Sequence, residues 1–158
     1  MVIFTFIVVH WYSSLFFQTF FHHRYAAHQM FDMSKSWEKV FFVFSFIAQG
    51  SSYLSPYAYG ILHRMHHAFA DTEKDPHSPK YDRNLFAMMW RTKVLYSNIF
   101  HGRVEVEKRF KDGVPKWLSF ENFAKSWTIR FVWITFYTGF YVVFSTEWWM
   151  YLFLPMHF

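Results

Sequence analysis

Three apolar stretches, separated by polar and charged segments, organise this chain. The first, residues 1–21, contains no Lys, Arg, Asp or Glu, and its apolar side chains would cover every face of a helix. Because a helix needs about 20 apolar residues to cross a bilayer, this stretch predicts a transmembrane helix. A secretory signal peptide is the competing interpretation. That class has a basic start and a small-residue cleavage site, whereas His22, His23 and Arg24 follow the apolar run here.

The second apolar stretch, residues 40–62, is interrupted by Gly50 and Pro56, so a full crossing by one straight helix is not expected. Positive charges mark the cytoplasmic side of membrane proteins, and twelve of the 16 Lys and Arg residues lie between Arg64 and Lys125. The segments on both sides of this stretch therefore belong on the cytoplasmic face. We expect residues 40–62 to form a bent, interfacial or re-entrant segment.

The third apolar stretch, residues 127–144, is long enough for a second transmembrane helix. No Lys or Arg follows Arg130, so the polar turn at Glu147 is expected on the outer side. The last run, residues 148–158, has 11 positions, about half of a crossing, and we interpret it as the start of a truncated transmembrane helix. On this interpretation the chain is an N-terminal piece of a longer protein.

The expected fold is an all-α, multi-pass integral membrane protein with a cytoplasmic helical cap at residues 80–126. Composition excludes several classes of function. With no Cys in 158 residues, disulfide scaffolds, zinc ribbons, thiolate iron clusters and cysteine nucleophiles are ruled out. The net charge of +5 is interpreted as an orientation signal, with membrane lipids and not nucleic acid as the partner.

Seven of the ten histidines fall in two windows, residues 22–28 and 63–77. At this His frequency an HxxHH match is expected roughly 0.04 times by chance, so His63, His66 and His67 are a strong signal. Their spacing of i, i+3 and i+4 places three imidazoles on one face of a helix. The HxxxxH spacing of the first window is weaker, with roughly 0.6 chance matches, and five residues along an ideal α-helix are offset by about 140°. That pair suits a helix end or kink, or the ligation of two neighbouring ions.

Clustered neutral imidazoles favour Fe, Zn, Cu or Ni over Mg or Ca, so the windows predict a transition-metal site. The zinc-protease pattern HExxH is absent because Arg64 occupies the glutamate position. Arg24 and Arg64 could pair with the carboxylates that follow His67, namely Asp71, Glu73 and Asp75. Metal-free histidines at the membrane interface are the alternative. The three histidines outside the two windows are interpreted as interfacial or core side chains: His10, His101 and His157.

The two windows resemble the first two histidine boxes of the membrane fatty acyl desaturases, specifically the stearoyl-CoA, Δ9-type branch. The residues that carry the resemblance are HRYAAH at 23–28 and HRMHHAFADTEKDPHS at 63–78. The resemblance implies a non-haem di-iron centre that uses O₂ to place a cis double bond in an acyl chain. It implies no catalytic group beyond the metal ligands, and those present would be His23, His28, His63, His66 and His67, with His22 as a competitor for the first position.

Three carboxylates, Asp71, Glu73 and Asp75, lie shortly after His67 and could accept hydrogen bonds from the ligand imidazoles. Helix capping or solvation is the alternative for each of them. The DPH sequence at 75–77 matches the family motif, so Asp71, Asp75 and His77 are the candidate supporting residues. The implied partners are an acyl-CoA or acyl-lipid substrate and a ferredoxin-like or haem-carrying electron donor, with the boxes on the cytoplasmic face. A third HxxHH box of the family is absent from this sequence, so the chain alone is expected to be inactive. The alternatives are a related histidine-box hydroxylase or ketolase, and a non-catalytic membrane protein that binds metal or haem.

Overall fold

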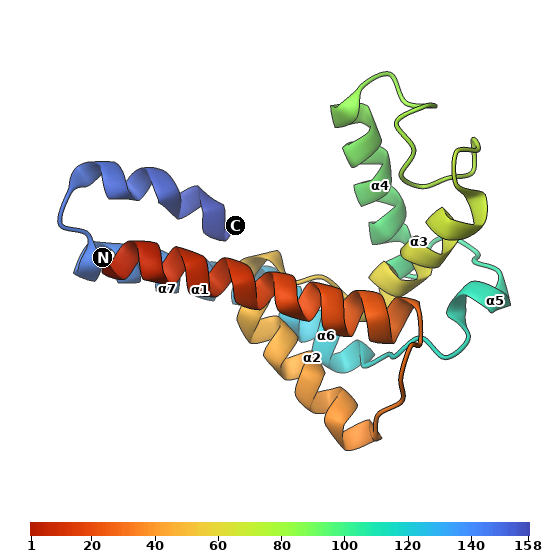
Figure 1. The fold of residues 1–158 in the computed structure, drawn as a ribbon, viewed down its shortest axis with the longest axis horizontal. Coiled ribbons are helices and arrows are strands. Elements are labelled where there is room, and N and C mark those ends of the chain that lie inside the picture. Colours follow the sequence, from red (N-terminus) through yellow and green to blue (C-terminus); the bar gives the residue numbers. More distant parts are fainter. The chain divides into compact units, whose positions relative to one another are not determined.

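The computed structural model describes residues 1–158 and contains helices and connecting turns but no strand, which confirms the all-α expectation (Figure 1). In chain order the elements are α1 (Val2–Phe17), η1 (Gln18–Ala27), α2 (Lys35–Gln49), η2 (Gly50–Ser52), α3 (Pro56–Phe69), α4 (Leu85–Phe100), α5 (Lys108–Lys111), α6 (Leu118–Ala124), α7 (Trp127–Phe144) and η3 (Trp148–His157).

The helices belong to two compact units. The first, which we call the apolar unit, consists of Met1–Thr19, Ser34–Leu54 and Trp117–Phe158. The second, which we call the histidine unit, consists of Phe20–Met33 and Ser55–Lys116 and contains both histidine windows. The predicted cap at residues 80–126 is therefore divided, since its last ten residues belong to the apolar unit.

One helix, Val2–Ala27, is long and apolar enough to cross a membrane. It combines α1 with the π-helical η1 and extends six residues beyond the predicted run of 1–21. The helix α7 has the bounds that the third apolar stretch predicts, but its Trp, Tyr and Thr content makes it less apolar than the first. A membrane crossing by α7 stays a prediction.

The second apolar stretch forms two helices with a break between them. The helix α2 ends at Gly50, whose φ of 55° lies in the left-handed region that favours glycine. A Cβ at this position would overlap the hydroxyl group of Tyr137. After η2, the Ser55 hydroxyl accepts a hydrogen bond from the Ala58 N–H, and Pro56 opens α3. The expected interruption of the helix is present, whereas a bent, interfacial or re-entrant course stays a prediction.

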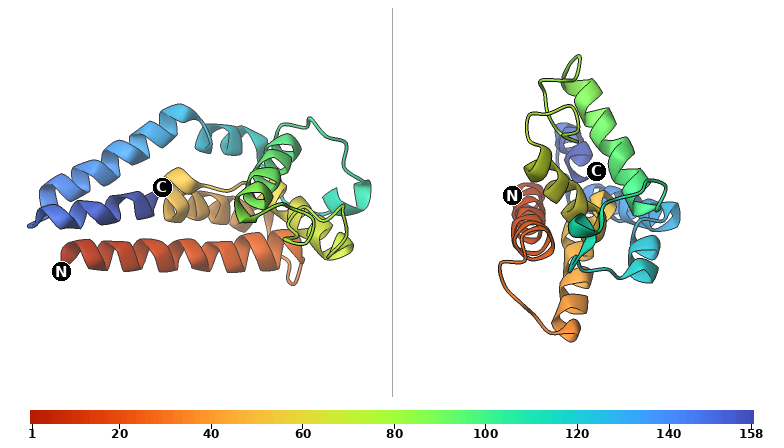
Figure 2. Two further views of the ribbon diagram at one scale, coloured as in Figure 1. Left: turned by 90° about the horizontal axis from the view of Figure 1, so that it is seen from above. Right: turned by 90° about the vertical axis from the view of Figure 1, so that its right-hand side faces the viewer.

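The last apolar run forms η3, a ten-residue 3₁₀-helix that returns alongside α1 within the apolar unit (Figures 1 and 2). Met150 of η3 lies in a buried cluster with Ile3 and Ile7 of α1 and Tyr141 of α7. A 3₁₀-helix rises about 2 Å per residue, so ten residues reach about 20 Å, less than a bilayer core. A short packed helix therefore forms this run, and its role as the start of a transmembrane helix stays a prediction.

In the histidine unit, α3 packs against α4 and α5. The core between them is apolar and is made of residues from α3, α4, α5 and the turns around α5: Ala58, Ile61, Ile99, Phe100, Val106, Phe110 and Val114. This core buries one face of α3 and leaves the histidine-bearing face, with His63, His66 and His67, outside it. The orientation of the second histidine window follows from that division.

Candidate metal centre

The helix α3 brings the three histidines of the second window onto one face. His63 and His67, one turn apart, have their Nε2 atoms 3.0 Å from each other. The ring of His66 is farther away, with its centroid 6.5 Å from that of His63. The i, i+3, i+4 spacing therefore produces the convergence that the sequence predicts, with His66 at its edge.

The first window lies at the end of η1, and its winding differs from the α-helix assumed in the sequence analysis. The His28 N–H donates to the His23 carbonyl at 3.0 Å, which is the i to i+5 hydrogen bond of a π-turn. The wider turn removes most of the 140° offset expected for five residues on an α-helix. The two rings consequently lie close together, with centroids 4.5 Å apart.

The two windows meet at His63. Its Nε2 atom lies 3.1 Å from Nε2 of His28, and its ring centroid lies 4.7 Å from that of His23. One nitrogen each from His23, His28 and His63 lies within 4.8 Å of the others. His67 joins the group, with its ring centroid 5.0 Å from that of His28. Four of the five predicted ligands thus converge, from two windows 35 residues apart.

The spacing of these nitrogens suits a shared cation. Two imidazole nitrogens bound to one ion at about 2.1 Å lie about 3.0 Å apart at a right angle and about 3.4 Å apart at a tetrahedral angle. His63 Nε2 is at 3.0 and 3.1 Å from two other Nε2 atoms, yet one ring nitrogen offers either one proton or one lone pair. A metal ion would satisfy all three nitrogens at once. The residues present therefore fit a transition-metal ion.

The charge state of the cluster also suits metal binding. Burial and the neighbouring imidazoles of His23, His67, His28 and His66 lower the pKa of His63 to about 4. Burial, followed by His23, His67 and Arg64, also lowers the pKa of His28. Both rings are neutral at pH 7, and the neutral imidazole is the form that binds a metal.

A buried carboxylate orients His66. Asp75 is 1% exposed, and its Oδ1 atom lies 2.7 Å from His66 Nδ1. Burial alone would raise the pKa of Asp75, but hydrogen bonds from His66 and from the backbone N–H groups of His77 and Asp71 outweigh it and lower the pKa. An ionised Asp75 accepts the Nδ1 proton, which leaves Nε2 of His66 free to bind a metal.

The other two predicted orienting residues act through their backbone. The Asp71 N–H donates to Asp75 at 3.1 Å and the His77 N–H donates to it at 2.9 Å. The His77 ring lies instead against α4, with Nδ1 at 3.1 Å from the Thr92 hydroxyl oxygen. Of the three carboxylates Asp71, Glu73 and Asp75, it is the buried Asp75 that bonds a candidate-ligand imidazole, whereas Asp71 and Glu73 are exposed.

Sequence reasoning did not single out Arg91, which supports this loop. Its guanidinium binds both carboxylate oxygens of Asp82, at 2.6 to 3.0 Å, and donates to the Asp75 carbonyl oxygen at 2.7 Å. The Asp82 side chain is the main cause of the raised pKa of Arg91. No spacing rule links these residues, since the contact depends on how the loop returns to α4.

Two further residues of the windows lie apart from the cluster. His22 is fully buried with its ring edge-on to Tyr59, 5.6 Å away, and the group of converging nitrogens is formed by His23, His28 and His63. Arg64 does not pair with the carboxylates Asp71, Glu73 and Asp75. Its guanidinium donates to backbone carbonyl oxygens, the shortest contact being 2.6 Å to Ala27.

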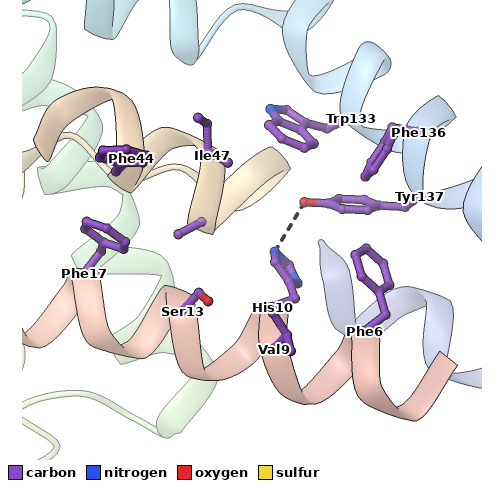
Figure 3. A pocket seen from close by; sticks show the side chains of 11 residues that line it. Phe6, Val9, His10, Ser13, Phe17, Phe44, Ile47, Trp133, Phe136 and Tyr137 are labelled. Atoms are coloured by element: carbon purple, nitrogen blue, oxygen red, sulfur yellow. Dashed lines mark hydrogen bonds between the residues drawn. The ribbon is translucent and has the colours of Figure 1, made fainter. Parts of the chain in front are cut away.

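The apolar unit contains a separate cavity of about 410 Å³ between α1, α2 and α7 (Figure 3). Its lining is almost wholly apolar and includes Phe6, Val9, Phe17, Phe44, Ile47, Trp133 and Phe136. The polar groups at this cavity are few, and one pair is the Tyr137 hydroxyl with His10 Nε2, 3.3 Å apart. A cavity with this lining suits a hydrocarbon chain better than a polar ligand.

Comparison with known proteins gives one partial similarity. A segment of 62 residues is 40% identical to the Delta-9 desaturase-like 5 protein of Arabidopsis thaliana. The alignment covers 39% of this chain and 19% of the Arabidopsis protein, so the chain matches about a fifth of that protein's length. No protein-family model matches the chain, and no solved structure matches it.

Proposed function

We propose that this chain carries the first two histidine boxes of a membrane-bound, oxygen-dependent acyl desaturase. The enzyme would introduce a cis double bond, at the Δ9 position, into a saturated acyl chain through a non-haem di-iron centre. The observation that carries this proposal is the convergence of His28, His63 and His67, whose Nε2 atoms are linked by separations of 3.1 and 3.0 Å. The partial similarity to a desaturase-like protein supports the same reaction class.

In this proposal the metal is held by His23, His28, His63, His66 and His67. Neutral imidazoles bind iron well and bind Mg or Ca poorly, which agrees with the lowered pKa of His63. Bound iron would activate O₂, the oxidant needed to remove hydrogen from an unactivated methylene group, a step that no side-chain base can perform. Asp75 keeps the Nδ1 proton on His66 and so fixes which nitrogen faces the metal.

The apolar cavity supports a lipid substrate. About 410 Å³ with an apolar lining accommodates part of an acyl chain, as either acyl-CoA or an acyl lipid. We further propose that the protein is multi-pass, with both boxes on the cytoplasmic face. There a ferredoxin-like or haem-carrying protein would deliver the two electrons that the reaction with O₂ requires.

A haem-binding role fits the cluster poorly. Two axial histidine nitrogens lie on opposite sides of a haem iron, about 4 Å apart, with the porphyrin ring between them. The Nε2 separations of 3.0 and 3.1 Å leave no room for such a ring. An optical spectrum separates the two cases, because haem gives a strong Soret band and non-haem iron does not.

Metal binding by the chain itself is the first test. We expect the purified chain, in detergent and without oxygen, to bind Fe(II), and His63→Ala to weaken binding at least tenfold because His63 contacts the ligands of both windows. His101→Ala is the matched control, since His101 is exposed at the end of α4 and bonds only to Ser97. Absent Fe(II) binding, or binding that His63→Ala leaves unchanged, would contradict the proposal.

The reaction is tested with the complete gene that encodes this chain. Expressed in cells that lack Δ9 unsaturation, it should produce new monounsaturated fatty acids, and His63→Ala in the same gene should abolish them. Oxygenated fatty acids in place of unsaturated ones would indicate the related hydroxylase or ketolase. No change in the fatty acid profile, with iron and oxygen present, would rule out the proposed reaction.

A further inference from the structure

Arg64 lies in the sequence between two of the candidate ligands, His63 and His66, but its side chain points away from the histidine cluster and binds backbone carbonyl groups. The Nε–H donates to the Ala27 carbonyl oxygen at 2.6 Å, and Nη2 donates to the Ala26 carbonyl oxygen at 3.1 Å. Nη1 donates to the carbonyl oxygens of Asp112, at 2.7 Å, and Phe110, at 3.4 Å. One guanidinium group therefore holds four backbone carbonyls from two separate segments.

Both segments present the carboxyl end of a helix to this cation. Ala26 and Ala27 are the last residues of η1, and Phe110 and Asp112 lie at the end of α5. The last carbonyls of a helix lack partners within the helix and carry partial negative charge. A planar guanidinium with five N–H donors can serve several of them at once, which an ammonium group cannot do in the same geometry.

The surrounding residues bring the same three segments into close contact. One turn before Arg64, a Cβ at Gly60 would lie 3.1 Å from both the Ala26 carbonyl oxygen and Val114 Cγ1. Gly113 has a φ of 69°, and a Cβ there would overlap the Gln29 side chain. Small residues thus allow η1, α3 and the turn after α5 to approach each other at the point where Arg64 binds.

This junction lies directly beside the ligands. His28 follows Ala27, the residue that Arg64 holds most closely, and His63 precedes Arg64 on α3. Adjacent residues on a helix point about 100° apart, so one can face the cluster while the next is bonded elsewhere. The carbonyl bonds of Arg64 therefore determine how near the end of η1 lies to α3.

We propose that Arg64 is a positioning residue that holds the first histidine window against the second, so that His28 and His63 can bind one metal ion. The inference depends on the proposed function, because it assumes that the histidine cluster binds a metal. Arg64 itself touches neither metal nor substrate. Its contribution is the separation of 3.1 Å between the Nε2 atoms of His28 and His63.

The test uses Co(II) as a spectroscopic probe for the full 158-residue chain, in detergent and without oxygen. We expect Arg64→Gln to lower Co(II) affinity about 10- to 100-fold and to change the Co(II) absorption spectrum, since a ligand from the first window is displaced. The Co(II) affinity of Arg64→Lys should lie between that of Arg64→Gln and that of the unmodified chain. For Arg64→Ala, millimolar guanidinium chloride should restore affinity, whereas NaCl at the same ionic strength should not.

Two control variants distinguish the positioning role of Arg64 from the loss of a positive charge and from a general loss of stability. Arg109→Gln removes an exposed arginine of α5 that pairs with Glu107 at 2.8 Å, and Co(II) binding should not change. Ile99→Ala weakens the core of the same unit but removes none of the hydrogen bonds of Arg64, and it should lower the unfolding temperature while the Co(II) spectrum keeps its shape.

The results distinguish the two proposals. If the unmodified chain binds Co(II) and Arg64→Gln binds it with the same affinity and spectrum, the role of Arg64 is wrong and the proposed metal site stands. If Ile99→Ala and Arg64→Gln change affinity and spectrum alike, Arg64 acts only through general stability and the inference is also overturned. If Arg64→Gln does not fold, Arg64→Lys decides by the same criteria. If the unmodified chain does not bind Co(II), both proposals fall.

Discussion

At the scale of single residues, the cluster combines neutral imidazoles with one buried carboxylate. His63 is within contact distance of candidate ligands from both windows, His28 and His67, and Asp75 is bonded to His66 at 2.7 Å. These two residues therefore lead to distinct predictions. Substitution at Asp75 tests ligand orientation, and titration of His63 tests the charge state of the site.

Asp75→Asn should weaken metal binding and reduce stability. The amide keeps the shape of the carboxylate but loses its charge, so the hydrogen bond to His66 Nδ1 becomes weaker and the ring orientation less defined. We expect Fe(II) affinity to fall about 10- to 100-fold. The free energy of unfolding should fall by about 1–3 kcal/mol, because Asp75 also accepts two backbone N–H groups. Glu105→Gln, at an exposed position, is the control, and an equal loss there would contradict this role.

The metal-free chain should lose stability in mild acid. The pKa of His63 is about 4 in the folded chain, against 6.5 for an unperturbed imidazole. Between these pH values the unfolded chain binds a proton that the folded chain does not. The free energy of unfolding therefore falls as the pH falls from 6.5 to about 4, and this group has no effect above that window. In thermal unfolding at a series of pH values, His63→Gln should lose less stability between pH 6.5 and about 4 than the unmodified chain. An equal loss of stability in both chains would disprove the role of His63 in this pH dependence.

At the scale of elements, the close approach of η1 and α3 is the feature on which the site depends. The π-turn places His28 above His23, and Gly60 lets the backbone of η1 lie directly against α3. Neither feature is a property of one helix alone. A side chain at Gly60 would push the two elements apart.

Gly60→Val should therefore destabilise the chain by about 1–3 kcal/mol, the usual cost of overpacking. A Cβ added at this position would lie 3.1 Å from two neighbouring atoms, and valine adds two methyl groups beyond it. Gly139→Val is a matched control on α7, because nothing lies within 4 Å of a Cβ there. Chemical unfolding of both variants provides the comparison, and similar stability of the two would argue against a tight η1–α3 contact.

At the scale of the whole molecule, membrane orientation is the property with the most consequences. One helix, Val2–Ala27, is long and apolar enough to span a membrane, and the positive charges concentrate after it. If the charge pattern sets the orientation, the histidine windows face the cytoplasm and the turn at Glu147 faces outward.

Because the chain has no Cys, single cysteines can report this orientation directly. We expect Asp32→Cys to resist a membrane-impermeant maleimide in intact cells and to react once the cells are opened. Glu147→Cys, at an exposed turn on the opposite side of the predicted α7 crossing, should react in intact cells. Labelling of both positions from the same side would contradict the predicted topology.

The features that follow from short-range spacing could be predicted from the order of residues. Apolar runs predicted helices, as at 127–144, and the i, i+3, i+4 pattern placed His63 and His67 on one face, because helical geometry follows from residue number alone. The carboxylates Asp71, Glu73 and Asp75 predicted a residue that orients a histidine ring. Because all three carry the same functional group, the sequence did not show which one would be buried.

The remaining features depend on long-range packing. The winding of η1 as a π-helix, the meeting of His28 with His63 and the choice of Asp75 depend on how distant segments return to each other. Arg64 shows the reason most clearly, since its partners are backbone carbonyls, and every residue has one. A sequence marks which side chains can bind a metal or a carbonyl, but only the folded backbone determines which of them lie within reach.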